Sequence, residues 1–134
     1  MYPAPSPLYP LTSQTGRTAI QAETTVQLAV DALENTKADD LRLFDVRGRS
    51  DLTDYVLLAS GSAAPHLRAL TQSLQADLKA AGAAPARISG DPDSGWIVVD
   101  CIDVVIHVFD PPTRAYYALE SLWPEGSIPV PSSR

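Results

Sequence analysis

The stretch Trp96–Phe109, WIVVDCIDVVIHVF, most constrains the fold, because it contains two strand patterns with almost no chain between them. Trp96–Val99 and Val104–Phe109 are rich in β-branched and aromatic residues, and two such runs in close succession predict an antiparallel hairpin. The connection holds Cys101 and Ile102 instead of the Asn-Gly or Asp-Gly pairs that favour tight turns. A locally unfavourable choice of this kind indicates a surface that serves something besides folding.

A two-residue loop at Cys101-Ile102 predicts which side chains face each other. The predicted pairs are Asp100 with Asp103, Val98 with Val105 and Trp96 with His107, and all six share one face because side chains alternate along a strand. Like charges directly opposite each other destabilise a sheet, so folding alone would not select the two aspartates. If exposed, Trp96 and the two carboxylates would suit docking of a basic protein. Alternatively, Trp96 packs under a helix and the aspartates are only solvated.

The rest of the chain alternates helix and strand patterns. Apolar residues at three- and four-residue spacing predict a first helix that ends near Lys37 and a second helix with an apolar stripe. Ser62 is a plausible N-cap of the second helix, and Gly82 can end it. Further strands are predicted at 41–46, 54–59 and 86–89, and a last helix at about 113–122. The run from Tyr55 to Ser89 has the length of a parallel strand–helix–strand crossover. The prediction is an α/β fold in which helices flank a mixed sheet of roughly five strands.

Composition sets the limits of the folded part. The chain of 134 residues suffices for one core, which we place at 19–125. Residues 1–18 and 126–134 are rich in Pro and Ser and are predicted to be a disordered extension and a disordered tail. Apolar runs are shorter than the ~18–20 residues of a membrane span, and the chain starts without a secretory signal pattern. A single cysteine, Cys101, is typical of a reducing compartment, so we expect a cytoplasmic protein with no membrane partner.

Charge is unevenly distributed along the chain. The segment Gly90–Gly126 holds seven acidic residues and one basic residue, Arg114, which accounts for the whole net charge of −6. Such a region repels nucleic-acid phosphates and favours a basic partner, so we expect no direct sequence-specific nucleic-acid binding. The simpler interpretation is that these acidic residues only keep the protein soluble.

Patterns that suggest catalysis or ligand binding are weak. Gly61-Ser62 between a strand and a helix could present amides to an anion, but a turn with a helix cap explains them as well. Cys101 and His107 are expected on opposite faces, which argues against a thiol–imidazole pair. Asp100, Asp103 and His107 contain ligand types that divalent ions accept, at a spacing that matches no closed site. We therefore predict no enzyme, no metal site and no cofactor.

Several motifs together resemble the ribosomal silencing factor family, also called the Iojap family. They occur in the family's order and spacing, and they are DVRGRS at 45–50, DY at 54–55, ASG at 59–61, GWIVVD at 95–100, DVVIH at 103–107 and YALESLW at 117–123. The resemblance implies a nucleotidyltransferase-like fold without catalysis. It also implies a translation repressor that binds the large ribosomal subunit at its fourteenth protein and sterically blocks joining of the small subunit under nutrient limitation, and that is often a homodimer when free.

The resemblance also suggests which residues bind the partner. Trp96 and Asp100 correspond to the family's ribosome-facing strand, Asp103 and His107 to the next strand, and Asp54 and Tyr55 to a further motif. We expect Trp96 to be an apolar anchor and the aspartates to pair with Lys or Arg. Family members commonly have Gly where this chain has Ile102, and a β-branched residue is costly at a positive φ. A large-subunit assembly factor using the same surface and, less favoured, a nucleotide-binding protein remain as alternatives.

Overall fold

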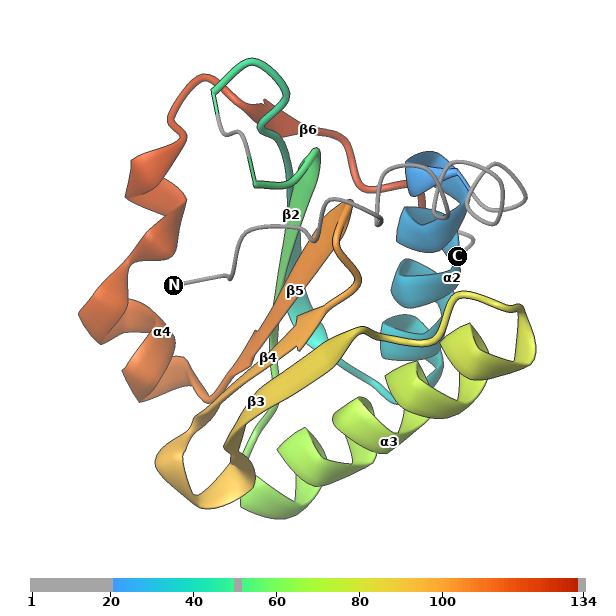
Figure 1. Ribbon diagram of the computed structural model, residues 1–134. Coiled ribbons are helices and arrows are strands. Elements are labelled where there is room, and N and C mark those ends of the chain that lie inside the picture. The colour runs from blue at the N-terminus through green and yellow to red at the C-terminus, as the bar shows by residue number, and fades with distance from the viewer. Residues whose placement is uncertain (1–20, 50–51, 133–134) are drawn as a thin grey trace.

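The computed structural model describes residues 21–49 and 52–132, so the predicted extension 1–18 lies outside the described residues (Figure 1). The helices are α2 (Ala22–Asn35), α3 (Ala64–Ala80) and α4 (Pro111–Tyr117), with two 3-10 helices, η1 (Pro92–Ser94) and η2 (Leu119–Leu122). The strands are β1 (Asp39–Asp45), β2 (Tyr55–Ser60), β3 (Arg87–Asp91), β4 (Trp96–Asp100), β5 (Val104–Phe109) and β6 (Ser127–Ile128).

One sheet in the order β3-β4-β5-β2-β1-β6 organises the molecule. Neighbouring strands are antiparallel except β2 and β5, which run parallel. β2 lies in the interior of the sheet, and all six of its residues are buried, as its continuous apolar run predicts. β3 runs in the same direction as β2, but β4 and β5 lie between them, so the predicted crossover is parallel without joining adjacent strands. The α/β prediction with a mixed sheet is confirmed, with six strands.

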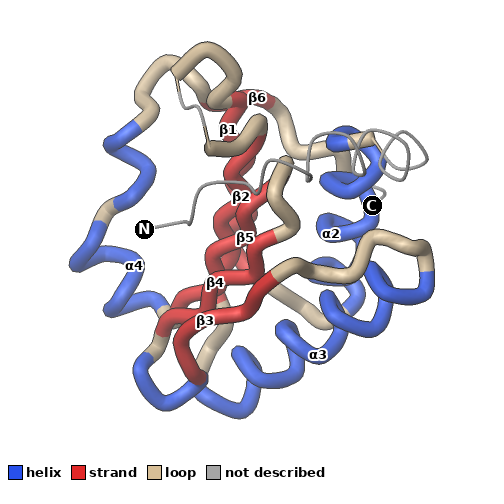
Figure 2. Tube along the Cα trace, viewed as in Figure 1, coloured by secondary structure: helices blue, strands red, loops and turns tan. Residues whose placement is uncertain are grey.

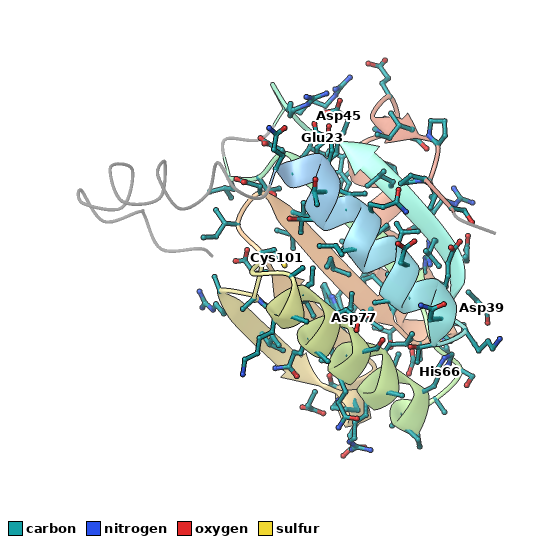
Figure 3. The ribbon with its side chains drawn as sticks, turned by 90° about the vertical axis from the view of Figure 1, so that its right-hand side faces the viewer. Glu23, Asp39, Asp45, His66, Asp77 and Cys101 are labelled. Atoms are coloured by element: carbon teal, nitrogen blue, oxygen red, sulfur yellow. The ribbon has the colours of Figure 1, made fainter. Side chains whose placement is uncertain are left out.

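Helices cover the two faces of the sheet unequally. α2 and α3 lie side by side across one face, and Figure 3 views the molecule from that side. α4 lies on the opposite side of the sheet (Figures 1 and 2). The chain therefore leaves the parallel strands β2 and β5 toward opposite faces. Among residues 21–49 and 52–132, no helix has the length and apolar character needed to cross a bilayer.

The main core lies between the sheet and the two long helices. α3 buries Leu67, Leu70, Leu74 and Leu78 at the spacing of one helical face, as predicted. Gly82 follows the helix with φ +81°, the left-handed conformation that glycine adopts without steric cost. The N-cap of α3 is Ala63 and not the predicted Ser62, whose amide donates to Nδ1 of His66 at 2.9 Å.

The C-terminal segment belongs to the sheet, which corrects the prediction of a disordered tail for residues 126–132; residues 133 and 134 lie outside the described residues. The Asp45 amide donates to the Gly126 carbonyl at 2.8 Å, and β6 continues the antiparallel pairing with β1. Ile128 and Val130 then pack against the main core. The Pro-rich composition concealed this apolar alternation, because proline is compatible with an edge strand although it ends helices. The C-terminal limit predicted at Glu125 is therefore too early.

The predicted last helix is two short helices. α4 ends at Ala118, which has φ 47° and ψ 50°, and η2 follows directly. Leu119 and Trp123 pack against a second apolar cluster on this side of the sheet, in which Trp123 lies 5.6 Å from the Phe44 ring. Leu122 is 61% exposed and does not belong to this cluster.

Candidate functional site

The β4–β5 hairpin has a different register from the predicted one. Asp100 pairs with Val105, Val98 with His107 and Trp96 with Phe109, so the strands are displaced by two residues and the aspartates do not face each other. A displacement by two residues keeps every side chain on its predicted face. Trp96, Asp100 and His107 therefore share the sheet face opposite α2 and α3.

The hairpin loop stores backbone strain at Ile102. The Asp103 amide donates to the Cys101 carbonyl at 2.9 Å across Ile102, whose φ is +71°. An i to i+2 hydrogen bond with a positive central φ describes the rare and strained γ-turn. The Asp100 carboxylate steadies the loop by accepting the Ile102 amide at 2.8 Å. The cost predicted for a β-branched residue at this position is therefore present in the structure.

Trp96 is the centre of an aromatic group. Its indole Nε1 donates to Nδ1 of His107 at 3.1 Å, which leaves the imidazole proton on Nε2. The ring centroids of Phe109 and Tyr117 lie 5.0 and 4.6 Å from that of Trp96. Burial lowers the pKa of His107 to about 4, so the imidazole is neutral near pH 7.

Two tyrosines extend this group into solvent. Tyr117 is 50% exposed and Tyr116 is 81% exposed, and their rings meet edge to face at 5.0 Å. Tyr116 is not among the site residues predicted from the sequence. The adjacent pair Tyr116-Tyr117 could have indicated an exposed aromatic surface, because a short helix cannot bury two neighbouring tyrosines. We call Trp96, Tyr116 and Tyr117 the aromatic end of this face.

Carboxylates gather at the other end of the same face. The amides of Asp54 and Tyr55 both donate to the Asp103 carbonyl, at 2.9 and 3.1 Å, which joins the start of β2 to the hairpin loop. Burial and then the negative charge of Asp103 raise the pKa of Asp54. Asp54, Asp100 and Asp103 form what we call the acidic end. Trp96 and Asp100 are separated by four residues of extended strand, or about 13 Å.

The six predicted site residues do not contribute equally to this face. Asp100 is only 9% exposed and holds the loop, so it shapes the hairpin more than it faces solvent. Tyr55 belongs to the opposite face, where it is 5% exposed and packs in the main core. Its hydroxyl donates to Glu23 at 2.9 Å, and the Arg47 guanidinium lies over its ring. Trp96 and His107 remain on the side that α2 and α3 leave free. Since Tyr55 and Val104 face the helix-side core, alternation assigns the preceding residues Asp54 and Asp103 to the free side as well.

The other suggested chemistries find little support in the geometry. Cys101 lies on the helix side near the end of α3 (Figure 3), and burial raises the pKa of its thiol to about 12. The Gly61 amide donates to the Phe109 carbonyl and the Ser62 amide to His66, so neither is free for an anion. Within the part of the chain that the structure describes, His, Cys, Asp and Glu form no group of three that could hold a metal ion.

Comparisons with known proteins agree on one family. A family model described as ribosomal silencing factor during starvation matches residues 19–133. The ribosomal silencing factor RsfS of Zymomonas mobilis is 32% identical over 119 residues, which cover 89% of this chain and 87% of that protein. The RsfS of Bacillus subtilis is 30% identical over 105 residues, or 78% of this chain and 87% of that protein. These relatives are named as regulators and not as enzymes.

Two further similarities extend the comparison. A solved structure of a Chromobacterium violaceum protein superimposes with a TM-score of 0.76 at 34% identity and covers 82% of this chain and 91% of that chain. The mouse protein named mitochondrial assembly of ribosomal large subunit protein 1 is 32% identical over 107 residues, which cover 78% of this chain and 47% of that longer protein.

Proposed function

Since this chain belongs to the ribosomal silencing factor family, we propose that it represses translation by binding the large ribosomal subunit and blocking the small subunit sterically. The contact on the large subunit is its fourteenth protein, and the setting is nutrient limitation in the cytoplasm. The observation that carries the proposal is the sheet face opposite α2 and α3, which combines an exposed aromatic end with an acidic end. Occupancy is sufficient for this activity, so no reacting groups are required.

The two ends of the face suit a basic protein surface. Exposed aromatic rings can bury a large area when a partner binds, at a low cost in side-chain entropy. Such residues dominate the binding energy at interfaces. Tyr116 and Tyr117 are therefore the strongest anchors, with Trp96 supporting them from below. Carboxylates about 13 Å away attract Lys or Arg and orient the partner along the strands. Asp103 and Asp54 supply this charge, while Asp100 acts mainly through the loop that it holds.

A role in large-subunit assembly is the second candidate. It is favoured by the name of the mouse relative, which refers to assembly of the mitochondrial large subunit. The same surface would serve both roles, since each requires binding to the large subunit. They differ in timing, because an assembly factor binds immature particles and a silencing factor binds complete ones.

The same aromatic end also suits a homodimer in the free protein. An exposed apolar patch can pair with its own copy around a two-fold axis, and the dimer would then compete with ribosome binding by mass action. Tyr117→Ala is expected to shift the mass measured by sedimentation toward the monomer. An unchanged dimer would place self-association elsewhere on the molecule.

Cosedimentation with purified large subunits tests the proposal. We expect the wild-type protein to migrate with large subunits in a sucrose gradient and to reduce formation of joined ribosomes after small subunits are added. Asp103→Lys should weaken binding about tenfold, because it reverses a charge at the acidic end. Asp77→Lys is the matched control, since Asp77 is exposed on α3 on the other side of the molecule (Figure 3).

The possible results distinguish an error in the proposed function from an error in the proposed docking face. Failure of the wild-type protein to bind large subunits would contradict the function itself. Binding with undiminished joining would favour assembly over silencing. Equal binding by Asp103→Lys, Tyr117→Ala and Asp77→Lys would show that the partner docks elsewhere.

A further inference from the structure

α4 is attached to the sheet in an unusual way, because the only residue that it buries is a charged one. Arg114 is 5% exposed, while both prolines and both tyrosines of this helix are exposed. A short surface helix ordinarily docks through an apolar stripe, because burial of apolar area provides its stability. Here a guanidinium occupies the position where such a stripe would contact the sheet.

The Arg114 side chain joins three separate elements. Its Nη1 donates to the Asp40 carbonyl of β1 at 2.6 Å and to Oγ of Ser60, the last residue of β2, at 2.8 Å. Its Nε donates to Oε2 of Glu120 in η2 at 2.8 Å. The planar guanidinium presents its donors in fixed directions, so satisfying these acceptors together fixes the position of α4.

Folding stability alone does not account for this arginine. Removing a charge from water is costly, and replacing a buried ion pair with apolar residues is often neutral or stabilising. The remaining nitrogen, Nη2, is buried without a hydrogen-bond partner within residues 21–49 and 52–132, and it lies 3.7 Å from a carboxylate oxygen of Asp40. The contact therefore provides defined geometry at some expense of stability.

The geometry that it defines is that of the aromatic end. Tyr117 follows Arg114 by one helical turn, and Ala118 then turns the chain so that Glu120 returns to the same guanidinium. Asp110 caps the start of α4 by accepting the Thr113 amide, and Trp123 packs beyond η2. Between these two ends, Arg114 is the sole buried residue of the arm formed by residues 111–122.

We infer that Arg114 is a positioning residue that holds this arm so that Tyr117 packs against Trp96 and, with Tyr116, presents the docking surface. The inference deepens the proposed function and rests on it for its effect on ribosome binding. The contact between the two rings, at 4.6 Å between centroids, is a property of the free protein and can be measured without the ribosome.

Three variants in a Trp123→Phe background, where Trp96 is the only tryptophan, test the inference. Arg114→Met keeps the length of the side chain without its donors, and Arg68→Met is the matched control at an exposed site on α3. Tyr117→Ala removes the ring that packs against Trp96. Acrylamide quenching of Trp96 fluorescence measures access to the indole, and cosedimentation measures affinity for large subunits.

We expect Arg114→Met to increase quenching to the level of Tyr117→Ala and to weaken subunit binding about tenfold, while Arg68→Met changes neither. The double variant Arg114→Met, Tyr117→Ala should bind large subunits about as weakly as Arg114→Met alone, because both changes remove the contribution of the Tyr117 ring. Additive losses, or wild-type quenching in Arg114→Met, would overturn the inference.

A fourth variant protects the test against misfolding. If Arg114→Met loses its cooperative thermal transition, Arg114→Lys retains the charge but presents its donors from one compact nitrogen instead of a planar fork, and an intermediate increase in quenching is expected. Wild-type quenching in Arg114→Lys would contradict the inference. If the wild-type protein does not bind large subunits, the proposed function fails, and the quenching series still decides whether Arg114 positions the arm.

Discussion

Ile102 and His107 are both held in constrained states on a hairpin that the rest of the sheet makes stable. Ile102 has a positive φ at the centre of a γ-turn, and His107 is held neutral against Trp96. The surrounding strand pairs fix both conformations, because β4 and β5 are each bonded on two sides. Such residues are where a substitution can raise stability, since natural proteins rarely reach their stability optimum.

Replacing Ile102 with Gly should stabilise the protein by about 1 kcal/mol. The left-handed region costs a residue with a Cβ about 1–2 kcal/mol, and part of the gain is offset by the greater freedom of glycine in the unfolded chain. Urea unfolding at pH 7 would measure the difference. Ile102→Ala is the control, because alanine removes the branch but keeps the Cβ and should recover only part of the gain. A destabilised Ile102→Gly variant would mean that the isoleucine side chain contributes packing that outweighs the strain.

His107 predicts a specific pH dependence of stability. Burial lowers the pKa of this imidazole from 6.5 to about 4 in the folded protein, so between these values the unfolded chain binds more protons. The stability due to neutral His107 is complete above pH 6.5 and declines as the pH falls toward 4, by between about 1 and 3 kcal/mol.

The contribution of His107 can be isolated by difference. His107→Gln keeps an acceptor for the Trp96 indole but does not titrate in this range. The difference between wild-type and variant unfolding free energies should therefore change between pH 6.5 and pH 4 and be constant above pH 7. A constant difference throughout would show that the imidazole titrates normally in the folded protein.

At the scale of elements, the C-terminal segment holds more of the fold than its composition indicates. It adds β6 beside β1, and Gln27 of α2 donates its side-chain amide to the Pro131 carbonyl at 2.8 Å. The C-terminal segment thus connects β1 to α2 and covers apolar surface that β1 and α2 would otherwise expose. Its prolines separate the apolar residues without interrupting any hydrogen bond that an interior strand would need.

Ending the chain at Glu125 should lower the free energy of unfolding by about 2 kcal/mol or more. The truncation removes Ile128 and Val130 from the core, and full burial of one such side chain contributes about 1.5–3 kcal/mol. Thermal and urea unfolding would measure the loss. A chain that ends at Ser132 is the control and should match the full-length protein. Equal stability of the shorter chain would mean that the segment packs without stabilising the fold.

Elements with strong periodicity were predictable, and elements defined by single contacts were not. The leucines of α3 recur at helical spacing and the apolar residues of β2 are continuous, so both patterns can be read directly from the sequence. The break at Ala118 is not, because it depends on Glu120 returning to Arg114 across the turn. The hairpin face was predicted correctly although its register was wrong by two residues, since alternation specifies the face and the turn geometry specifies the register.

At the scale of the whole molecule, charge and shape divide the protein into two sides. The helix side encloses most of the core, and the other side has the aromatic and acidic ends. The only basic residue of the segment Gly90–Gly126 is Arg114, and because it is buried the solvent meets the acidic residues of this segment alone. The excess of acidic residues in this segment indicated a basic partner. Because Arg114 is buried, the surface of the segment is more negative than the charge count alone suggests.

The pairing of β6 with β1 also bears on how the protein is synthesised. β1 is the first strand to be translated and β6 the last, and β2 likewise waits for β5 near the other end of the chain. Contacts between such distant segments close long loops, which makes them slow to form. A nascent chain can form α2 and α3 early, but its docking face is finished only after almost all of it has emerged. We therefore expect a nascent chain to gain affinity for ribosomes only after β5 has paired with β2 and α4 has emerged.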